Sequence, residues 1–335
     1  MQTLRLSAND PGSIEQAAHI IRAGGLVAFP TETVYGLGGN ALDTDAVEKI
    51  FTAKARPLWD PLIVHVSSRE MLHSLVARLP VKFDDLFAAF MPGPLTLVLA
   101  KKVTVPDVVT AGRASVAVRF PAHGVAQRLI AASGLPIAAP SANRFQHVSP
   151  TTAEHVLADL DGRIDAVLDG GPCPIGVEST VLDLTAEPRI LRQGAVTAEE
   201  LQRLLGGVVV AHAVAGTLKE GLPAPGMMSR HYAPRTKLML SEGRESALAG
   251  LAHNLAKQKL GVLLPSGWHT PAALRFDWGK WGDWKVLATR LYAGLRWLDR
   301  QKPDAIIAPL PPEEGLASAI RQRLLKAAGA AEVAP

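Results

Sequence analysis

The stretch that most constrains the fold runs from Phe29 to His65, where two short apolar runs alternate with a polar loop and a helical pattern. The first run, Leu26 to Phe29, stops at Pro30 and leads into a loop rich in hydroxyl groups and glycine. A helical pattern follows, and the second apolar run ends at His65. This order places small hydroxyls, flexible backbone and fixed cations near strand ends, which is where open α/β sheets bind ligands. The ligand it indicates is small, polar and anionic.

Short apolar runs recur along the chain and predict an α/β protein with two domains. In residues 1–205 they are rich in branched side chains, as in LTLVLA and SVAVRF, and they are typical of strands. Helical patterns and tight turns both join them, which favours a mixed sheet over a purely parallel one. A separate strand–helix alternation in residues 238–335 predicts a smaller parallel α/β domain. We expect the proline- and glycine-rich residues 206–237 to link the two domains.

Composition excludes several classes of protein. The one cysteine, Cys173, excludes a disulfide framework and any multi-cysteine metal site. The single cysteine favours a reducing cytosol, so we expect a cytoplasmic protein. No apolar run reaches the length that spans a membrane, and we expect no membrane partner. The formal net charge is +4, and the basic residues are dispersed, which indicates weak contact with RNA at most.

Two cations follow the helical pattern. Pro57 should end the helix, so that Lys54 lies in its last turn and Arg56 on irregular backbone. A lysine point charge beside a planar guanidinium suits a polyphosphate. The alternative is a pair of solvated charges that stabilise the helix dipole.

The loop after Pro30 has two interpretations. The hydroxyl of Thr33 and the backbone N–H groups around it can bind the carboxylate or amine of a small ligand, or the hydroxyls can bond within a turn. Residues 36–41 match G-x-G-x-x-A, but a dinucleotide site needs the glycines directly after a strand and at the start of a helix. We therefore predict no nicotinamide site and interpret these glycines as part of a flexible loop.

Later strand ends carry further candidates. Arg119 ends the run SVAVR, where it would bind a carboxylate or form a surface ion pair. The hydroxyl and amide of Ser141 and Asn143 follow the run LPIAAP and suit phosphate or ribose oxygens. Ser179 precedes a strand pattern, and Arg192 ends one. No histidines have metal-ligand spacing, and there is no Ser–His–Asp or Cys–His signature.

Taken together, these motifs resemble the YrdC-like threonylcarbamoyl-AMP synthases. FPTETVYGLG, the KxR of Lys54 and Arg56, PLIVH, VAVRFP, PSAN and ESTVLD stand in the order typical of that family, over about residues 18–194. APGMMSRHYAP and EEGLASAIRQRLLKAA resemble its longer, two-domain form. The resemblance implies a twisted sheet around a large concave cavity, a Rossmann-like second domain, and a linker that closes over the active site.

The resemblance also implies a reaction. L-Threonine, bicarbonate (or CO2) and ATP would give L-threonylcarbamoyl-AMP and pyrophosphate for a tRNA threonylcarbamoyl-transferase complex, with Mg²⁺ held mainly through phosphates and water and no organic cofactor. By resemblance, the residues that hold threonine or its carbamate are Thr33, His65, Arg119, Ala139 and Ser179. Those around ATP are Lys54, Arg56, Asp60, Ser115, Ser141, Asn143, Ser149, Arg192 and Tyr232, with Arg230 and His231 beside the tyrosine. Lys54, Arg56, Ser141 and Asn143 would carry the catalysis.

Two positions depart from the family pattern: Asp60, and Gln193, which replaces a frequent proline after Arg192. Two rival functions also stay open. Asp60 stands where the family usually has asparagine, and a carboxylate near ATP is repulsive unless it faces Mg²⁺ or a cation. The related carbamoyl-transfer module of hydrogenase maturation belongs to a larger, cysteine-rich protein, which the single cysteine and the length argue against. A non-catalytic RNA-binding or translation-accessory protein of the same fold would bind RNA in a salt-dependent way without turnover.

Overall fold

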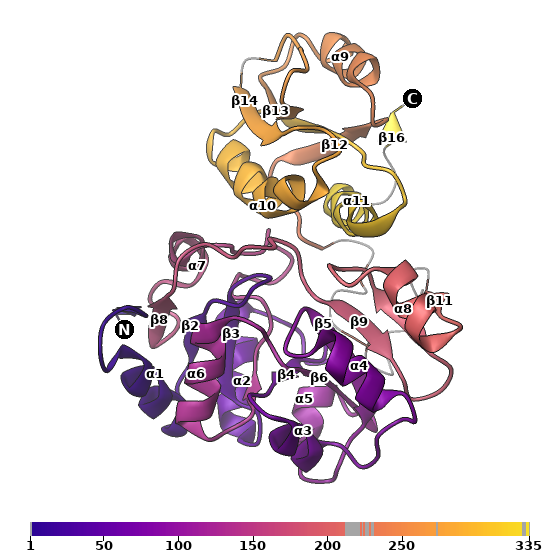
Figure 1. The fold of residues 1–335 in the computed structure, drawn as a ribbon. Helices are drawn as coiled ribbons and strands as arrows, with labels where there is room; N and C mark the ends of the chain where they lie inside the picture. The colour runs from indigo at the N-terminus through magenta and orange to yellow at the C-terminus, as the bar shows by residue number, and fades with distance from the viewer. Residues whose placement is uncertain are drawn as a thin grey trace. The chain divides into compact units, whose positions relative to one another are not determined.

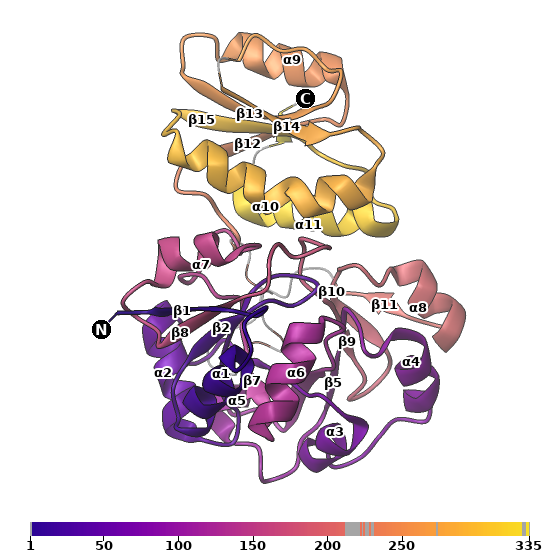
Figure 2. The same ribbon diagram turned by 60° about the vertical axis from the view of Figure 1, so that its left-hand side comes forward.

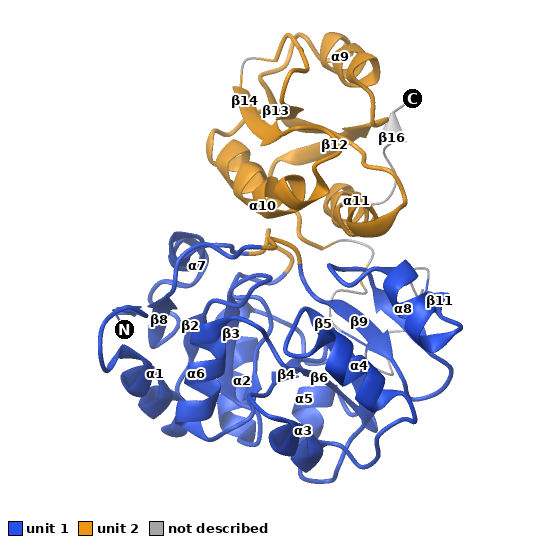
Figure 3. Ribbon diagram, in the orientation of Figure 1, with its two compact units in different colours: residues 1–145, 150–174, 178–227 blue, residues 146–149, 175–177, 228–335 orange. Residues whose placement is uncertain are grey.

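The computed structural model describes residues 2–211, 231–272, 274–329 and 333–334, together with residues 222, 224 and 228. The chain divides into two compact units (Figure 3). The first comprises residues 1–145, 150–174 and 178–227, and the second comprises residues 146–149, 175–177 and 228–335. Half of the predicted linker, including Arg230, lies outside the described residues. The domain boundaries at 205 and 238 stay predictions.

The first unit is built on a mixed sheet of eleven strands, as the sequence predicts (Figure 1). In spatial order the strands are β1 (Leu4–Ser7), β8 (Ala166–Asp169), β2 (Val27–Phe29), β3 (Gly36–Asn40), β7 (Ile137–Ala138), β4 (Ile63–His65), β6 (Ser115–Arg119), β5 (Leu95–Ala100), β9 (Thr180–Asp183), β10 (Arg189–Arg192) and β11 (Val209–Val210). The sheet contains both parallel pairs, such as β4 with β6, and antiparallel pairs, such as β5 with β6. The chain therefore returns repeatedly to the middle of one sheet, where the predicted site residues gather.

Helices cover this sheet. They are α1 (Ser13–Arg22), α2 (Thr44–Lys54), α3 (Arg69–Leu75), α4 (Phe83–Phe90), α5 (Asp107–Thr110), α6 (Gly124–Ser133), α7 (Ala153–Leu160) and α8 (Ala198–Leu205). The side chain of Asp43 accepts hydrogen bonds from two backbone N–H groups at the start of α2. That helix ends at Ala55, which has a left-handed φ of 52°, two residues before Pro57. The predicted end of the helix is confirmed, and it fixes where Lys54 and Arg56 lie.

The two faces of the central strands have different roles. In β6, Val116 and Val118 point into the main hydrophobic core, and burying each contributes about 1.5–3 kcal/mol. Ala117 points to the opposite face, where it packs with Ile63 and Val98 in a smaller cluster. That second face also bears the predicted ligand-binding side chains of β4 and β6.

The second unit is a five-stranded parallel sheet, which confirms the prediction for the C-terminal region. Its strands in spatial order are β14 (Leu274–Gly279), β13 (Leu260–Pro265), β15 (Ala305–Pro309), β12 (Lys237–Ser241) and β16 (Val333–Ala334). Helix α9 (Glu245–Asn254) covers one face, and α10 (Trp284–Arg300) and α11 (Gly315–Ala328) cover the other (Figure 2). No helix in the part of the chain that the structure describes is long and apolar enough to cross a membrane.

Candidate active site

Two predicted threonine-binding residues, His65 and Arg119, are neighbours at the carboxyl ends of parallel strands. They are register partners between β4 and β6. The predicted strand end at Arg119 is confirmed. The alternative of a surface ion pair is wrong, because Arg119 is only 4% exposed.

The guanidinium of Arg119 is held by the loop that follows β2. Its Nη1 donates a hydrogen bond of 2.9 Å to Thr33 Oγ1. Its Nη2 lies 2.8 Å from Glu32 Oε1 at an angle poor for a hydrogen bond, so the contact is an ion pair. Thr31 Oγ1 lies 2.8 Å from Thr33 Oγ1 and donates to the carbonyl of Val34. Thr31 is therefore bonded within the turn, whereas Thr33 also faces the arginine.

Burial and these charges set the protonation states. Burial opposes ionisation of Glu32, but Arg119 and nearby backbone N–H groups together outweigh it and hold the pKa of that carboxyl below its usual value. Burial, and then repulsion by Arg119, lowers the pKa of His65 to about 3, although Glu32 partly offsets both effects. The imidazole is therefore neutral at physiological pH. Its Nδ1 has no hydrogen-bond partner among the described residues. A neutral ring with one uncommitted nitrogen can hydrogen-bond a small polar ligand.

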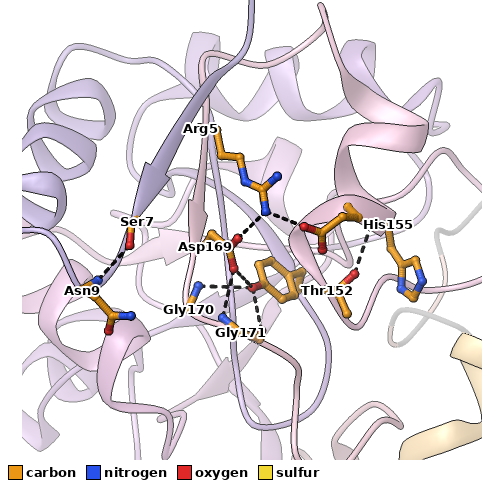
Figure 4. A network of polar contacts seen from close by, with 10 residues as sticks. Arg5, Ser7, Asn9, Thr152, His155, Asp169, Gly170 and Gly171 are labelled. Atoms are coloured by element: carbon orange, nitrogen blue, oxygen red, sulfur yellow. Dashed lines mark hydrogen bonds and ion pairs between the residues drawn. The ribbon is translucent and has the colours of Figure 1, made fainter.

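A second network fixes the far side of this loop (Figure 4). The hydroxyl of Tyr35, a fully buried residue, donates 2.7 Å to the carbonyl of Gly171 and accepts from the N–H of Gly170. Asp169 caps the N–H of Gly171 at 3.0 Å and pairs with Arg5 at 2.7 Å. Burial raises the pKa of Tyr35, so the phenol keeps its proton. The tyrosine thus ties the threonine-bearing loop to the end of β8.

The glycines after this loop differ from the prediction. Gly36 to Asn40 form strand β3, so the flexible-loop interpretation is wrong for them. A Cβ on Gly38 would lie 2.7 Å from Phe29, and one on Gly36 would lie 3.2 Å from the Cβ of Ala139. Close packing between strands therefore requires these glycines. A strand at this position also bears out the rejection of a dinucleotide fingerprint, which needs a helix there.

The same strand brings the segment of Ala139 and Ser141 into place. The N–H of Ala139 donates to the carbonyl of Ile63 at 2.9 Å, at the start of β4. Gly36 and Ser141 form an antiparallel bridge. The backbone of Ala139, a predicted threonine contact, thus lies between β3 and β4, close to the strand that carries His65.

Lys54 is joined to two other predicted catalytic residues. Its ammonium donates to the backbone carbonyls of Ser141 and Asn143. The interpretation as a solvated charge is wrong, because Lys54 is 1% exposed. Burial, and then repulsion by Arg56, lowers the pKa of Lys54 well below its usual value, against the attraction of Asp60. The amide of Asn143 donates to the carbonyl of Arg144 at 2.8 Å.

Arg56 is buried as well, and its guanidinium explains how a carboxylate is tolerated at position 60. Its Nη2 lies 2.9 Å from Asp60 Oδ1, in an ion pair whose side chains are 4% and 0% exposed. Its Nε and Nη2 also donate to the carbonyls of Asp60 and Pro61, at 3.0 and 2.8 Å. The unusual carboxylate therefore faces a cation, which is one of the two conditions under which it is tolerable near ATP. Its contact with the nucleotide stays a prediction.

Ser115 lies at the opposite end of β6 from Arg119. Ile63 and Ala117 are register partners, and Pro61 and Ser115 each lie two residues before that pair. Extending the parallel register places Ser115 beside the segment that Arg56 holds. His65 and Arg119 thus lie at the carboxyl ends of these strands, and Ser115 and the segment that Arg56 holds lie at their amino ends.

Ser179 and Arg192 are hydrogen-bonded to each other. Arg192 donates to the hydroxyl and the carbonyl of Ser179, both at 3.0 Å. Ser179 Oγ also lies 2.8 Å from Thr96 Oγ1, and Thr96 is the register partner of Arg119. Predicted contacts for threonine and for ATP are therefore joined across β6, β5 and β9.

Two predicted ATP contacts belong to the second unit. Ser149 lies in residues 146–149, and its carbonyl accepts from Arg296 at 3.3 Å. Tyr232, which is 2% exposed, stacks on Tyr292 with 6.0 Å between ring centroids. The guanidinium of Arg323 lies 5.3 Å from the centroid of the Tyr232 ring.

Sequence reasoning missed two residues that shape the site, Tyr35 and Thr96. Thr96 is the one hydroxyl in the apolar run LTLVLA, which is a weak signal for a polar contact on one face of a strand. Tyr35 is the one aromatic residue between Pro30 and Asn40, and its partner lies more than 130 residues later in the chain. Neither signal identifies the partner.

Comparison with known proteins decides the family. The family profile described as "Telomere recombination", which groups Sua5, YciO and YrdC proteins, matches residues 19–194. The profile described as "Threonylcarbamoyl-AMP synthase, C-terminal domain" matches residues 196–329. The chain belongs to the threonylcarbamoyl-AMP synthase family. It has both parts of the two-domain form.

Relatives of this family match nearly the whole chain. The threonylcarbamoyl-AMP synthase of Pyrococcus abyssi is 44% identical over 94% of both chains. That of Bacillus subtilis is 44% identical over 98% of this chain and 96% of its own. The crystal structure of P. abyssi Sua5 complexed with L-threonine superimposes with a TM-score of 0.93 at 42% identity, over 99% of each chain. The two-domain α/β fold of this chain is therefore the fold of the family.

Proposed function

We propose that the protein is an L-threonylcarbamoyladenylate synthase, which converts L-threonine, bicarbonate (or CO2) and ATP into L-threonylcarbamoyl-AMP and pyrophosphate. One observation carries the proposal most directly. A buried cluster of Thr33, Glu32, His65 and Arg119 lies at one end of β4 and β6, and a second buried cluster around Lys54 and Arg56 lies toward the other end. A site with these two ends suits an amino acid joined to a nucleotide.

The first end has the groups that an amino acid requires. Arg119 offers a fixed guanidinium for the carboxylate, and Glu32 offers a negative charge for the ammonium of the incoming amino acid. Neutral His65 and the hydroxyls of Thr33 and Ser179 can hydrogen-bond the rest of the molecule. Buried polar groups discriminate strongly against ligands that leave them without hydrogen-bond partners, because an unpaired buried group is costly.

The second end suits the transfer of the adenylyl group of ATP. A carbamate oxygen attacks the α-phosphorus of ATP, and the bond to the bridging oxygen of pyrophosphate breaks. Such a reaction depends on positioning and charge neutralisation rather than on a protein nucleophile. Lys54 holds the backbone of Ser141 and Asn143 in place, and Arg56 is oriented by Asp60 and Pro61. Ser115, Arg192, Ser149 and Tyr232 are the further ATP contacts in this proposal.

Magnesium enters the proposal as a companion of ATP. No group of three or more histidine, cysteine or carboxylate side chains that could hold a metal ion occurs within the described ranges. Asp60, the carboxylate at the phosphate end, is engaged by Arg56. This donor set fits an ion held mainly through phosphates and water, which screens phosphate charge when bound.

The product would pass to a tRNA threonylcarbamoyl-transferase complex. Contact between this chain and tRNA would be weak, because the formal net charge of the chain is only +4. A cytoplasmic location agrees with the single, buried cysteine. The alternative of a non-catalytic RNA-binding protein has no support from the relatives, which are named as synthases.

Pyrophosphate release tests the proposal. The purified protein is incubated with ATP, Mg²⁺ and bicarbonate, with L-threonine, L-valine or no amino acid. We expect pyrophosphate release with L-threonine and little without an amino acid. L-Valine should support less release than L-threonine, because it lacks the hydroxyl group. Release that is equal with and without L-threonine would contradict the proposal.

A further inference from the structure

A depression of about 670 Å³ opens in the first unit where β6 begins. It is lined by Arg78, Ala100, Ala111, Gly112, Arg113, Ala114, Ser115 and Thr185. The lining thus contains two arginines and two hydroxyl residues and no acidic residue. Two carboxylates adjoin the lining: Asp183 accepts hydrogen bonds from the N–H and the hydroxyl of Thr185, and Asp107 pairs with Lys101. This chemistry suits an anion with several oxygens, such as a phosphate chain.

The depression adjoins the phosphate end of the proposed active site. Ser115 links the two, because it lines the depression and, by extension of the register of β4 and β6, lies near Pro61, whose carbonyl accepts from Arg56. The backbone supports this proximity, since the N–H of Leu62 donates to the carbonyl of Val109 at 2.8 Å, in the helix just before the lining residues.

Three arginines in this part of the first unit differ in solvent exposure. Arg56 is buried, Arg113 is half-buried, and Arg78 is exposed. Arg78 has no hydrogen bond or ion pair with any residue that the structure describes. Positive charge thus continues from the buried cluster to the surface, and such a series attracts an anion along its length.

A second depression in this unit shows the contrast. It is larger, about 810 Å³, and its lining includes Asp45, Glu48 and Asp165 as well as Lys49 and Arg163. Lys49 is also engaged with the carbonyl of Gly24. Mixed charge of this kind does not select an anion, and Arg163 therefore provides a matched control.

We propose that the depression at Ser115 is a subsite for the phosphate tail, which receives the β- and γ-phosphates of ATP and holds pyrophosphate on its way to solvent. This inference rests on the proposed function, because it assigns the leaving group of that reaction. Arg113 would contact the phosphates nearer the reaction centre, and Arg78 would contact them at the mouth.

Calorimetric titration of the full-length protein with inorganic pyrophosphate, without ATP, tests the subsite. The variants are Arg78→Gln, Arg113→Gln and the double variant, with Arg163→Gln as the control and circular dichroism as the check of folding. We expect each single change to weaken pyrophosphate binding about threefold to tenfold, the double change to weaken it more than tenfold, and the control to leave it unchanged. In turnover, the KM for ATP should rise while the KM for L-threonine stays constant.

The two proposals fail separately. If the folded double variant binds pyrophosphate as the wild type does, the subsite is overturned, whether or not the wild type forms the adenylate. If pyrophosphate binding depends on both arginines but the wild type forms no adenylate, the subsite is supported and the synthase function is overturned. Because Arg78 is exposed, its single variant keeps the test informative even if the double variant is unstable.

Discussion

Arg119 donates a hydrogen bond of 2.9 Å from its Nη1 to the hydroxyl of Thr33, across 86 residues of sequence. The same guanidinium forms an ion pair with Glu32, the residue before Thr33 in the same loop. Two neighbouring loop residues thus fix one arginine at the end of β6, and the arginine in turn fixes the loop. Because all three side chains are buried, the geometry of the threonine end exists before any ligand binds.

Thr33→Val removes a hydroxyl with little change of shape. We expect the KM for L-threonine to rise about tenfold, because roughly 1–1.5 kcal/mol of hydrogen bonding is lost and Arg119 loses an orienting partner. Steady-state kinetics with saturating ATP measures this change. Thr52→Val, at an exposed position of α2, is the matched control. Equal KM values for the two variants would remove the Thr33 hydroxyl from threonine binding.

The ion pair of Arg56 and Asp60 should respond unequally to loss of either partner. Arg56→Met leaves a buried carboxylate without its cation, and we expect it to lower the free energy of unfolding by about 3–5 kcal/mol. Asp60→Asn keeps the carbonyl contacts of Arg56 and should cost less. Urea unfolding of both variants gives the order. A larger loss for Asp60→Asn would show that Arg56 is not held mainly by this pair.

His65 should make stability depend on pH. Its folded pKa of about 3 lies below the ordinary value of 6.5, so the unfolded chain binds more protons between those values and the free energy of unfolding falls as pH falls through that window. From pH 7 to pH 5 this contributes a loss of about 2 kcal/mol. Urea unfolding at both pH values should show that His65→Gln removes this loss. His73→Gln, at an exposed site, should keep it; an unchanged loss in His65→Gln would contradict the account.

Tyr35→Phe tests the network that ties the loop to β8. The change leaves the carbonyl of Gly171 and the N–H of Gly170 without their partner, and we expect a loss of about 1–3 kcal/mol in the free energy of unfolding. A positioning role adds a kinetic signature that mere destabilisation lacks. The KM for L-threonine should rise while the KM for ATP stays constant below the unfolding temperature. A parallel rise of both values would assign Tyr35 to general stability alone.

Much of the fold is predictable from local patterns. Branched apolar runs gave the mixed sheet, and the order of Asp43, Lys54 and Pro57 gave both ends of α2. The strand from Gly36 to Asn40 was mispredicted because glycine has low β-propensity. Glycine stands at position 38 of this strand because a Cβ there would clash with the side chains of Phe29 and Ile137.

The site was predictable in its residue types but not in its contacts. A lysine at the end of a helix is usually solvated. Nothing near Lys54 in the sequence shows that its ammonium will donate hydrogen bonds to the carbonyls of Ser141 and Asn143, which lie 87 and 89 residues later. In the same way, the sequence shows the carboxylate of Asp60 and the guanidinium of Arg56 but not that both are buried. Burial is a property of the packed sheet, so it cannot be read from the spacing of the two residues.

The central claim is that one site joins carbon from bicarbonate, L-threonine and AMP. The most direct measurement is mass spectrometry of the nucleotide product formed from ATP, L-threonine and ¹³C-labelled bicarbonate. The account predicts a threonylcarbamoyl-AMP that carries the heavy carbon, in the wild type and in Thr52→Val, and far less of it in Arg56→Met. Threonyl-AMP without the added carbon, or no adenylate from the folded wild-type protein, would contradict it.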